Sequence, residues 1–176
     1  MKAFLLTIVF LCAHAYADEV SSSDQQNLIV KNLETCFSPK EGCDQKLIGV
    51  INSAKTTLDI AIFSITHTGI AAAIVEAQER GVVVRMVVDK GQSEGAKSQT
   101  DELIKAKIAV KIGNATGIMH DKYCIVDKAV METGSFNYTT SATSYNTENQ
   151  IYITDKGVIK RYQDNFENLW SEALSE

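Results

Sequence analysis

One stretch of the sequence, from His120 to Asn137, combines an imidazole, an ammonium and neutral hydrogen-bond donors. His120 and Lys122 are two residues apart in a segment with strand character, so their side chains should emerge on one face about 7 Å apart. Ser135 and Asn137 follow Gly134, which permits a sharp turn or a close approach to a ligand. Neutral imidazole, with an unperturbed pKa of about 6.5, is a nucleophile at pH 7. Lys122, Ser135 and Asn137 would bind the phosphate and stabilise charge on its non-bridging oxygens, so the stretch predicts attack on a phosphodiester.

Two carboxylates complete the candidate catalytic set. Asp127 has the opposite strand parity to His120 and ends the segment, so we expect it to brace a loop or accept backbone hydrogen bonds. Glu148, just before the next expected strand, is the best candidate to fix the tautomer of His120 and support its developing positive charge. A lone histidine or lysine is usually structural or solvated. A match at six specified positions within 18 residues is much stronger evidence, because it would arise by chance in a chain of this length with a probability on the order of one in 10⁵–10⁶.

The pattern H-x-K-x4-D-x6-G-S-x-N resembles the signature of the phospholipase D superfamily. Its positions are filled by His120, Lys122, Asp127, Gly134, Ser135 and Asn137. The resemblance runs from about Phe37 to the last residue and is strongest to the small bacterial endonuclease branch, in which Glu148 matches a downstream acid by position. It implies a metal-independent phosphodiesterase that works without a cofactor, through a covalent phosphohistidine on His120.

Only one H-x-K occurs in the chain, whereas the chemistry needs a second group to protonate the leaving alkoxide and then activate water. Either His67 serves, or two chains bring their His120 side chains together across a two-fold axis. The small single-motif relatives that the chain resembles are homodimers of the second kind. We favour the homodimer, because His67 is more simply explained as a loop or N-terminal helix residue.

The sequence contains few residues in patterns that bind a catalytic metal ion. H-E-x-x-H, paired Cys or His ligands and a Walker loop are all missing from it. The remaining alternative is a divalent ion held between Asp89 and Asp127. We therefore expect no metal site and activity that persists in excess EDTA.

The first residues read as an export signal. Residues 1–17 have one cation, an apolar run and an A-Y-A exit, which is typical of a secretory signal peptide cleaved after Ala17. A retained anchor is the alternative, but the apolar run is shorter than the roughly 20 residues that span a bilayer. Residues 18–35 form a polar leader and residues 36–176 the phosphodiesterase domain. We expect an exported protein, periplasmic or secreted, without stable membrane insertion after cleavage.

Three cysteines remain after such a cleavage. Cys36 and Cys43 bracket a turn marked by Pro39 and Gly42, and an oxidising compartment favours a disulfide between them. Cys124 is left over in an apolar stretch and is expected to be a small buried side chain.

Strands and helices alternate along the domain. Branched or alternating apolar runs predict strands at 57–63, 82–88, 108–112, 120–127, 129–135 and 149–154. Helical spacing predicts helices at 43–54, 70–80, 101–106 and 155–175, with Gly81 as a stop signal. The pattern indicates an α/β protein with a mixed, largely parallel β-sheet flanked by helices, as in a phospholipase D-like sandwich with one motif per chain.

The charge limits the substrate. The 176 residues carry a formal charge of −5, or −6 from Asp18 onward, which argues against coating nucleic acid by bulk charge. Cations that could still line a groove are Lys90, Lys97, Lys105, Lys107, Lys111 and Arg161. We expect weak, non-specific binding of a nucleic acid substrate. A lipid phosphodiesterase acting on phosphatidyl headgroups, or a binding module with a degenerate site, would be the alternatives.

Overall fold

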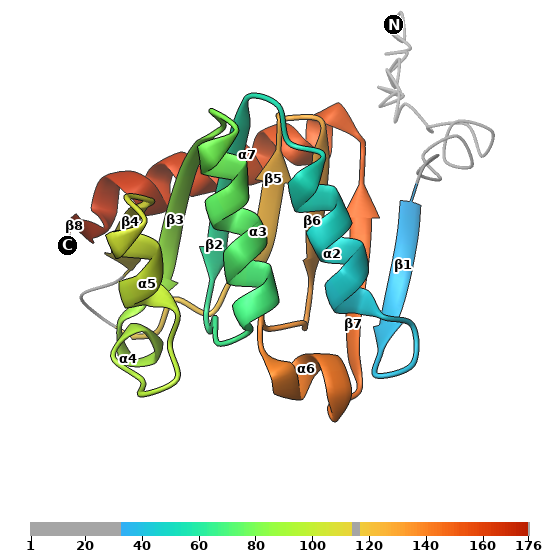
Figure 1. Ribbon diagram of the computed structural model, residues 1–176. Helices are drawn as coiled ribbons and strands as arrows, with labels where there is room; N and C mark the ends of the chain where they lie inside the picture. Colours follow the sequence, from blue (N-terminus) through green and yellow to red (C-terminus); the bar gives the residue numbers. More distant parts are fainter. Residues whose placement is uncertain (1–32, 114–116, 176) are drawn as a thin grey trace, which may run out of the picture. The chain divides into compact units, whose positions relative to one another are not determined.

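The computed structural model describes residues 33–113 and 117–175, so the expected signal peptide and most of the expected leader lie outside the described residues. Within that part of the chain the strands form one sheet in the order β1-β7-β6-β5-β2-β3-β4-β8 (Figure 1). The strands are β1 (Leu33–Ser38), β2 (Thr57–Ile62), β3 (Val83–Asp89), β4 (Ala109–Gly113), β5 (Lys122–Val126), β6 (Val130–Gly134), β7 (Glu148–Ile153) and β8 (Leu174–Ser175). The helices are α2 (Cys43–Asn52), α3 (Thr68–Glu79), α4 (Lys90–Ser93), α5 (Thr100–Lys105), α6 (Thr140–Ser144) and α7 (Lys156–Glu172).

The expected α/β class, a mixed sheet flanked by helices, is confirmed, but the sheet is not largely parallel. Only the pairs β2·β3 and β3·β4 run parallel. The pairs β1·β7, β2·β5, β4·β8, β5·β6 and β6·β7 run antiparallel. The first half of the chain alternates strands with crossover helices, which makes neighbours parallel. In the second half a three-residue turn joins β5 to β6, and such a short link permits only an antiparallel pair.

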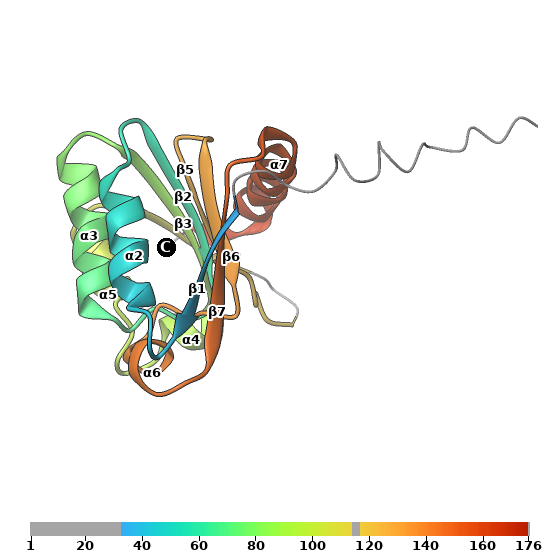
Figure 2. The same ribbon diagram turned by 90° about the vertical axis from the view of Figure 1, so that its right-hand side faces the viewer.

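The helices cover the two faces of the sheet separately. Figure 2 shows α2 and α3 on one face and α7 on the other. The alternation of β5 serves both layers, because Cys124 packs in the cluster under α2 and α3 while Tyr123 packs under α7. The expected amphipathic face of the last helix is confirmed, with Phe166 fully buried and Trp170 packed against the same cluster. No helix in the described residues is long and apolar enough to cross a bilayer.

The elements missed from sequence are short or lie at an edge. β1 begins at Leu33, inside the expected 18–35 leader, so the domain boundary falls earlier than expected. Only Cys36 and Ser38 of this strand are buried, so its hydrophobic pattern is weak. α6 is a five-residue helix whose cap, Thr139, accepts a hydrogen bond from the amide of Ala142. The expected stop at Gly81 is confirmed, with φ 91° directly after the cap of α3.

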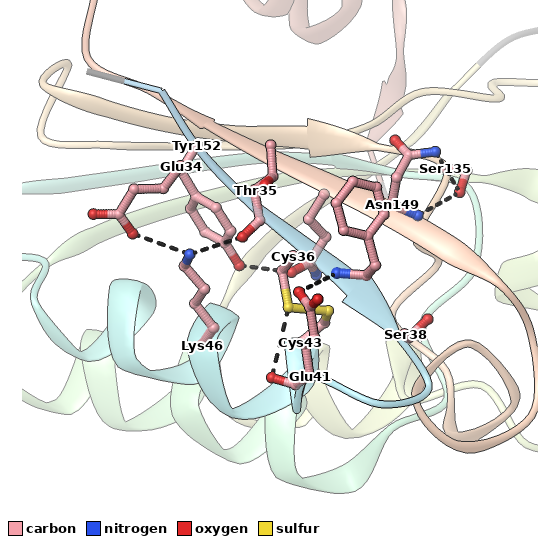
Figure 3. The surroundings of a disulfide bond; sticks show 12 residues. Glu34, Thr35, Cys36, Ser38, Glu41, Cys43, Lys46, Ser135, Asn149 and Tyr152 are labelled. Atoms are coloured by element: carbon pink, nitrogen blue, oxygen red, sulfur yellow. Dashed lines mark hydrogen bonds and ion pairs between the residues drawn. A yellow bond between two sulfur atoms is a disulfide. The ribbon is translucent and has the colours of Figure 1, made fainter. Parts of the chain in front are cut away.

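A disulfide ties the end of β1 to the start of α2. Cys36 and Cys43 are bonded as expected, with their Cα atoms 5.7 Å apart and both residues buried (Figure 3). β1 in turn pairs with β7, placing Phe37 opposite Asn149. Cys124 is a free, buried thiol as expected, and burial raises its pKa.

Replacing both bonded cysteines should lower stability measurably. The loop that the disulfide closes is short, with a sequence separation of 7, so constraint of the unfolded chain supplies about 2 kcal/mol. We expect the Cys36→Ser/Cys43→Ser variant to have a free energy of unfolding lower by about 2 kcal/mol, and therefore a lower urea midpoint. Wild-type protein with its disulfide reduced is the matched comparison and should lose a similar free energy of unfolding. Unfolding midpoints equal for the double variant and the wild type would show that the disulfide contributes no stability.

A carboxylic acid is buried in the layer under α2 and α3. Glu132 has no exposed surface, and the Tyr138 hydroxyl donates to its Oε2 at 3.1 Å. Burial raises the pKa of Glu132 to about 8, a shift that the Tyr138 hydrogen bond only partly opposes. The group is therefore neutral in the folded protein at pH 7, whereas it ionises near pH 4.5 when unfolded.

This difference makes stability depend on pH. Below about pH 4.5 Glu132 is neutral in both states, and as pH rises toward 8 the unfolded state gains from ionisation that the folded state lacks. Glu132→Gln removes the titration, so the free energy of unfolding of the variant, relative to that of the wild type, should rise by about 3–4 kcal/mol from pH 5 to pH 8. Urea unfolding at these two pH values measures the change. A difference between the two proteins that is the same at both pH values would mean that Glu132 is ionised in the fold.

Candidate active site

The ends of four strands meet at one edge of the sheet. β2 ends there and β5 begins, while β6 ends and β7 begins beside them (Figure 1). This is the carboxyl edge of the parallel pair β2·β3, where open α/β sheets bind ligands. The register therefore places Ser135 and Glu148 at the same edge as the pair His120 and Lys122, although they follow that pair by more than ten residues in the chain.

His120 and Lys122 lie together around Phe63. His120 is exposed, and its ring centroid is 4.5 Å from that of Phe63 in an edge-to-face arrangement. The Lys122 ammonium lies 5.1 Å above the Phe63 ring and donates to the backbone carbonyl of His120 at 2.9 Å. Two of its protons remain for a ligand. Burial lowers the pKa of Lys122, while the charges of Asp121 and Glu148 oppose that change. The pair thus offers an accessible imidazole beside a partly desolvated cation.

Ser135 is committed to neighbouring residues. Its hydroxyl donates to Glu148 Oε2 at 2.5 Å. The same hydroxyl accepts from the Asn149 amide at 3.1 Å (Figure 3). The other oxygen of Glu148 accepts from Asn146 at 2.9 Å. Two expectations therefore need correction in this structure. The Ser135 proton is held by Glu148 instead of facing a phosphate, and the carboxylate of Glu148 bonds Ser135 and Asn146 instead of His120.

Gly134 is required by the close approach of two strands. A Cβ atom at this position would lie 2.1 Å from the carbonyl oxygen of Asn149. The same carbonyl accepts from the Ser135 amide at 3.1 Å. The sequence indicated a sharp turn or close contact with a ligand, and the structure shows contact with the backbone of β7. Gly134 thereby sets the position of Ser135.

Asn137 lies at the same edge. The next residue, Tyr138, donates its amide to the carbonyl of Ser64, just beyond the end of β2. The side-chain oxygen of Asn137 is buried and makes no hydrogen bond within the described residues. This oxygen is an acceptor, so it cannot bind a phosphate oxygen, and the expected role of Asn137 as a donor stays a prediction for its side-chain nitrogen.

Asp127 lies at the opposite end of β5 from His120. It accepts hydrogen bonds from the amides of Lys55, Thr56 and Thr57 and from the Thr56 hydroxyl. Partial burial opposes ionisation, but these bonds lower the pKa of Asp127 to about 2. The expectation that it braces a loop is confirmed, and Asp127 is therefore not a group that contacts the reacting atoms.

Asp89 has a positioning role that the sequence did not reveal. It ends β3 at the active-site edge, is buried, and accepts from the Met119 amide at 3.0 Å and the Gln92 amide at 3.1 Å. It thus holds the residue before His120. The alternative of a divalent ion held between Asp89 and Asp127 is wrong, because the two carboxylates lie at opposite ends of the strands. Within the described residues no group of three or more His, Cys, Asp and Glu side chains is placed to hold a metal ion.

His67 caps a helix. Its Nδ1 accepts from the Ile70 amide at 3.2 Å, and its Nε2 lies 3.7 Å from a carboxylate oxygen of Asp44. Both ring nitrogens face groups of the fold, as expected for an N-terminal helix residue. The structure therefore does not offer His67 as a partner for His120.

Two neighbours of the site were not predicted as such, although each left a trace in the sequence. Phe63 is the last residue of the expected strand at 57–63, and Asp89 directly follows the expected strand at 82–88. The carboxyl ends of parallel strands are where α/β proteins place site residues, so position alone would have indicated both.

The comparisons agree with this geometry. Residues 47–170 match the family described as cardiolipin synthase, PLD-like domain. A phospholipase D from Rickettsia prowazekii is 37% identical over 135 residues, which cover 77% of this chain and 66% of that relative. The structure of Nuc, a phospholipase D family member from Salmonella typhimurium, superposes with a TM-score of 0.78 and 28% identity, covering 82% of this chain and 97% of Nuc. NucT from Helicobacter pylori gives 0.77 and 27%, covering 82% and 99%.

The fold and the site define a phosphodiesterase of the α/β class. The chain belongs to the phospholipase D superfamily, as the family match and the filled H-x-K motif show together. It is accordingly a hydrolase acting on phosphodiester bonds.

Proposed function

We propose that the protein is an exported, metal-independent endonuclease that cleaves DNA, with RNA as a second substrate, without sequence preference. The observation that carries the proposal is the exposed His120 beside the Lys122 ammonium, which donates to its carbonyl at 2.9 Å. An accessible neutral imidazole attacks a phosphorus atom more readily when a cation binds the non-bridging oxygens. The side-chain nitrogen of Asn137 is the further donor that we assign to those oxygens.

The reaction proceeds in two displacements at phosphorus. A ring nitrogen of His120 forms a bond to phosphorus as the bond to the leaving alkoxide breaks, and an imidazolium gives that alkoxide a proton. Water then attacks the phosphohistidine and transfers its proton to the same second imidazole, which restores both groups. Lys122 neutralises the added charge in both steps.

The second imidazole is supplied by a second copy of the chain. Because both nitrogens of His67 face groups of the fold, a homodimer with the two His120 side chains across a two-fold axis provides the missing group. Each protomer then contributes one nucleophile or one acid to a shared centre.

Nucleic acid is the favoured substrate. The chain covers nearly the full length of Nuc and NucT and resembles the small endonuclease branch. The expected groove of cations is only partly available, since Lys111 donates to the Trp170 carbonyl and Lys105 pairs with Glu102. Binding should therefore be weak and lowered by salt. A lipid phosphodiesterase is the second candidate, favoured by the name of the Rickettsia prowazekii relative.

Export is part of the proposal. A disulfide between Cys36 and Cys43 persists in an oxidising compartment, which supports secretion or a periplasmic location after removal of residues 1–17.

One assay tests the function. The purified protein in excess EDTA is offered plasmid DNA, RNA and phosphatidylcholine vesicles. We expect nicking of the nucleic acid, and no release of choline. Choline release without nicking would establish the lipid phosphodiesterase instead, and retention of DNA without any turnover would show a binding module.

A further inference from the structure

A polar groove of about 690 Å³ runs along the side of α7. Its lining includes Arg161, Asn165 and Asn168, which are spaced by four and three residues and so project from one side of the helix. All three side chains are exposed. α7 lies on the face of the sheet opposite α2 and α3 (Figure 2), so the groove lies on the α7 side of the sheet.

The groove adjoins the reaction centre through one residue. Asp121 lines it and stands between His120 and Lys122 in the chain, so its side chain points to the other face of the sheet from theirs. The carbonyl of Asp121 accepts from the amide of Phe63 at 2.8 Å, which anchors this junction. Burial raises the pKa of Asp121, and the charges of Lys122 and His120 oppose this, as expected for groups in close proximity.

The charges in the groove nearly cancel. Asp164 lines it but forms an ion pair with Lys160 at 2.6 Å. This leaves one cation, Arg161, against one carboxylate, Asp121. A surface of this kind attracts few phosphates by bulk charge, but it can hold a single phosphate at the guanidinium. The polar character is also unsuited to an acyl chain.

Amides supply the remaining recognition groups. Asn165 donates to the Tyr123 hydroxyl at 3.0 Å, which fixes the orientation of its amide and leaves the side-chain oxygen as an acceptor. Asn168 lies one helical turn further along the same side. Asparagine amides pair with the edges of nucleobases and with sugar hydroxyls, whereas guanidinium groups pair with phosphate oxygens.

We propose that this groove is a subsite for a nucleotide next to the scissile phosphodiester. Arg161 binds the neighbouring phosphate, and Asn165 and Asn168 hydrogen-bond to the base and sugar. The inference rests on the proposed nuclease function and extends it, because it makes a polynucleotide strand the substrate and gives its path along α7.

Two phosphodiester substrates, one with a neighbouring nucleotide and one without, test the subsite. A single-stranded oligonucleotide extends into the groove, whereas bis(p-nitrophenyl) phosphate has no neighbouring nucleotide. For the Arg161→Ala/Asn168→Ala variant we expect kcat/KM on the oligonucleotide to fall about tenfold, mainly through KM. Its salt dependence should weaken by about 0.7 in the slope of log K against log salt, the value for one phosphate contact on a single strand. Turnover of the small diester should change less than twofold.

Lys156→Ala is the matched control, because it removes the same charge from α7 outside the groove. It should leave both substrates unaffected. Equal losses on both substrates, or no loss on either, would overturn the subsite while leaving the nuclease function intact. A loss confined to phosphatidylcholine vesicles would assign the groove to a lipid headgroup and overturn it as well. Wild-type protein inactive on both diesters would overturn the function itself, and with it the subsite.

Discussion

His120→Ala should abolish nicking of plasmid DNA, with a loss of at least about 10³-fold in kcat/KM. The imidazole forms the covalent bond to phosphorus, and in the homodimer the same substitution also removes the acid that protonates the leaving group, so both steps fail together. The side chain is exposed and contacts Phe63 only at its edge, so the fold should be retained. Initial rates of nicking in EDTA, measured on protein with an unchanged melting temperature, give the result.

His67→Ala is the control, because it removes the other histidine of the domain. Loss of the hydrogen bond from the Ile70 amide to Nδ1 should cost about 1 kcal/mol of stability and little activity. Residual nicking by His120→Ala within tenfold of the wild type would exclude His120 as the nucleophile. A collapse of activity in His67→Ala would restore it as the second proton-transfer group.

Asp59→Ala should destabilise the fold by about 3–4 kcal/mol. Asp59 is buried and accepts from Arg85 at 2.7 and 2.9 Å and from Gln163 of α7 at 2.7 Å. Removing this carboxylate leaves a partly buried guanidinium and an amide without their partner, which is far more costly than loss of an exposed ion pair. Since Gln163 belongs to α7, the helix would also lose one of its polar contacts with the sheet. Urea unfolding measures the change.

Glu167→Ala is the matched comparison. Glu167 binds the same guanidinium at 2.8 Å, but its side chain is 50% exposed, so its loss should cost less than about 1 kcal/mol. Equal costs for the two variants would mean that burial of Asp59 does not govern the strength of this ion pair.

The sequence predicted the fold where the hydrophobic pattern was continuous. The strands at 57–63 and 82–88 are nearly continuous runs of apolar residues and the closing helix has helical periodicity, and the structure has β2, β3 and α7 there. Strand direction in the second half could not be inferred from periodicity, because it depends on which edge of the sheet each strand joins. β1 was missed because an edge strand buries only alternate side chains.

The sequence predicted which residues form the site, but not the hydrogen bonds between them. The motif identified His120 and Lys122, and strand parity separated Asp127 from them correctly. Which group binds the hydroxyl of Ser135 is decided by the register of β6 against β7, with Gly134 opposite Gln150, and no local pattern encodes that register. The link between Glu148 and Ser135 was therefore beyond the sequence.

The central claim is that two His120 side chains, one from each of two chains, act on one phosphorus atom. Sedimentation equilibrium of the protein at the concentrations used for the nicking assay tests it most directly. We expect an active species with twice the mass of one chain, and specific activity that falls on dilution as this dimer dissociates. A species with the mass of a single chain and undiminished specific activity would contradict it.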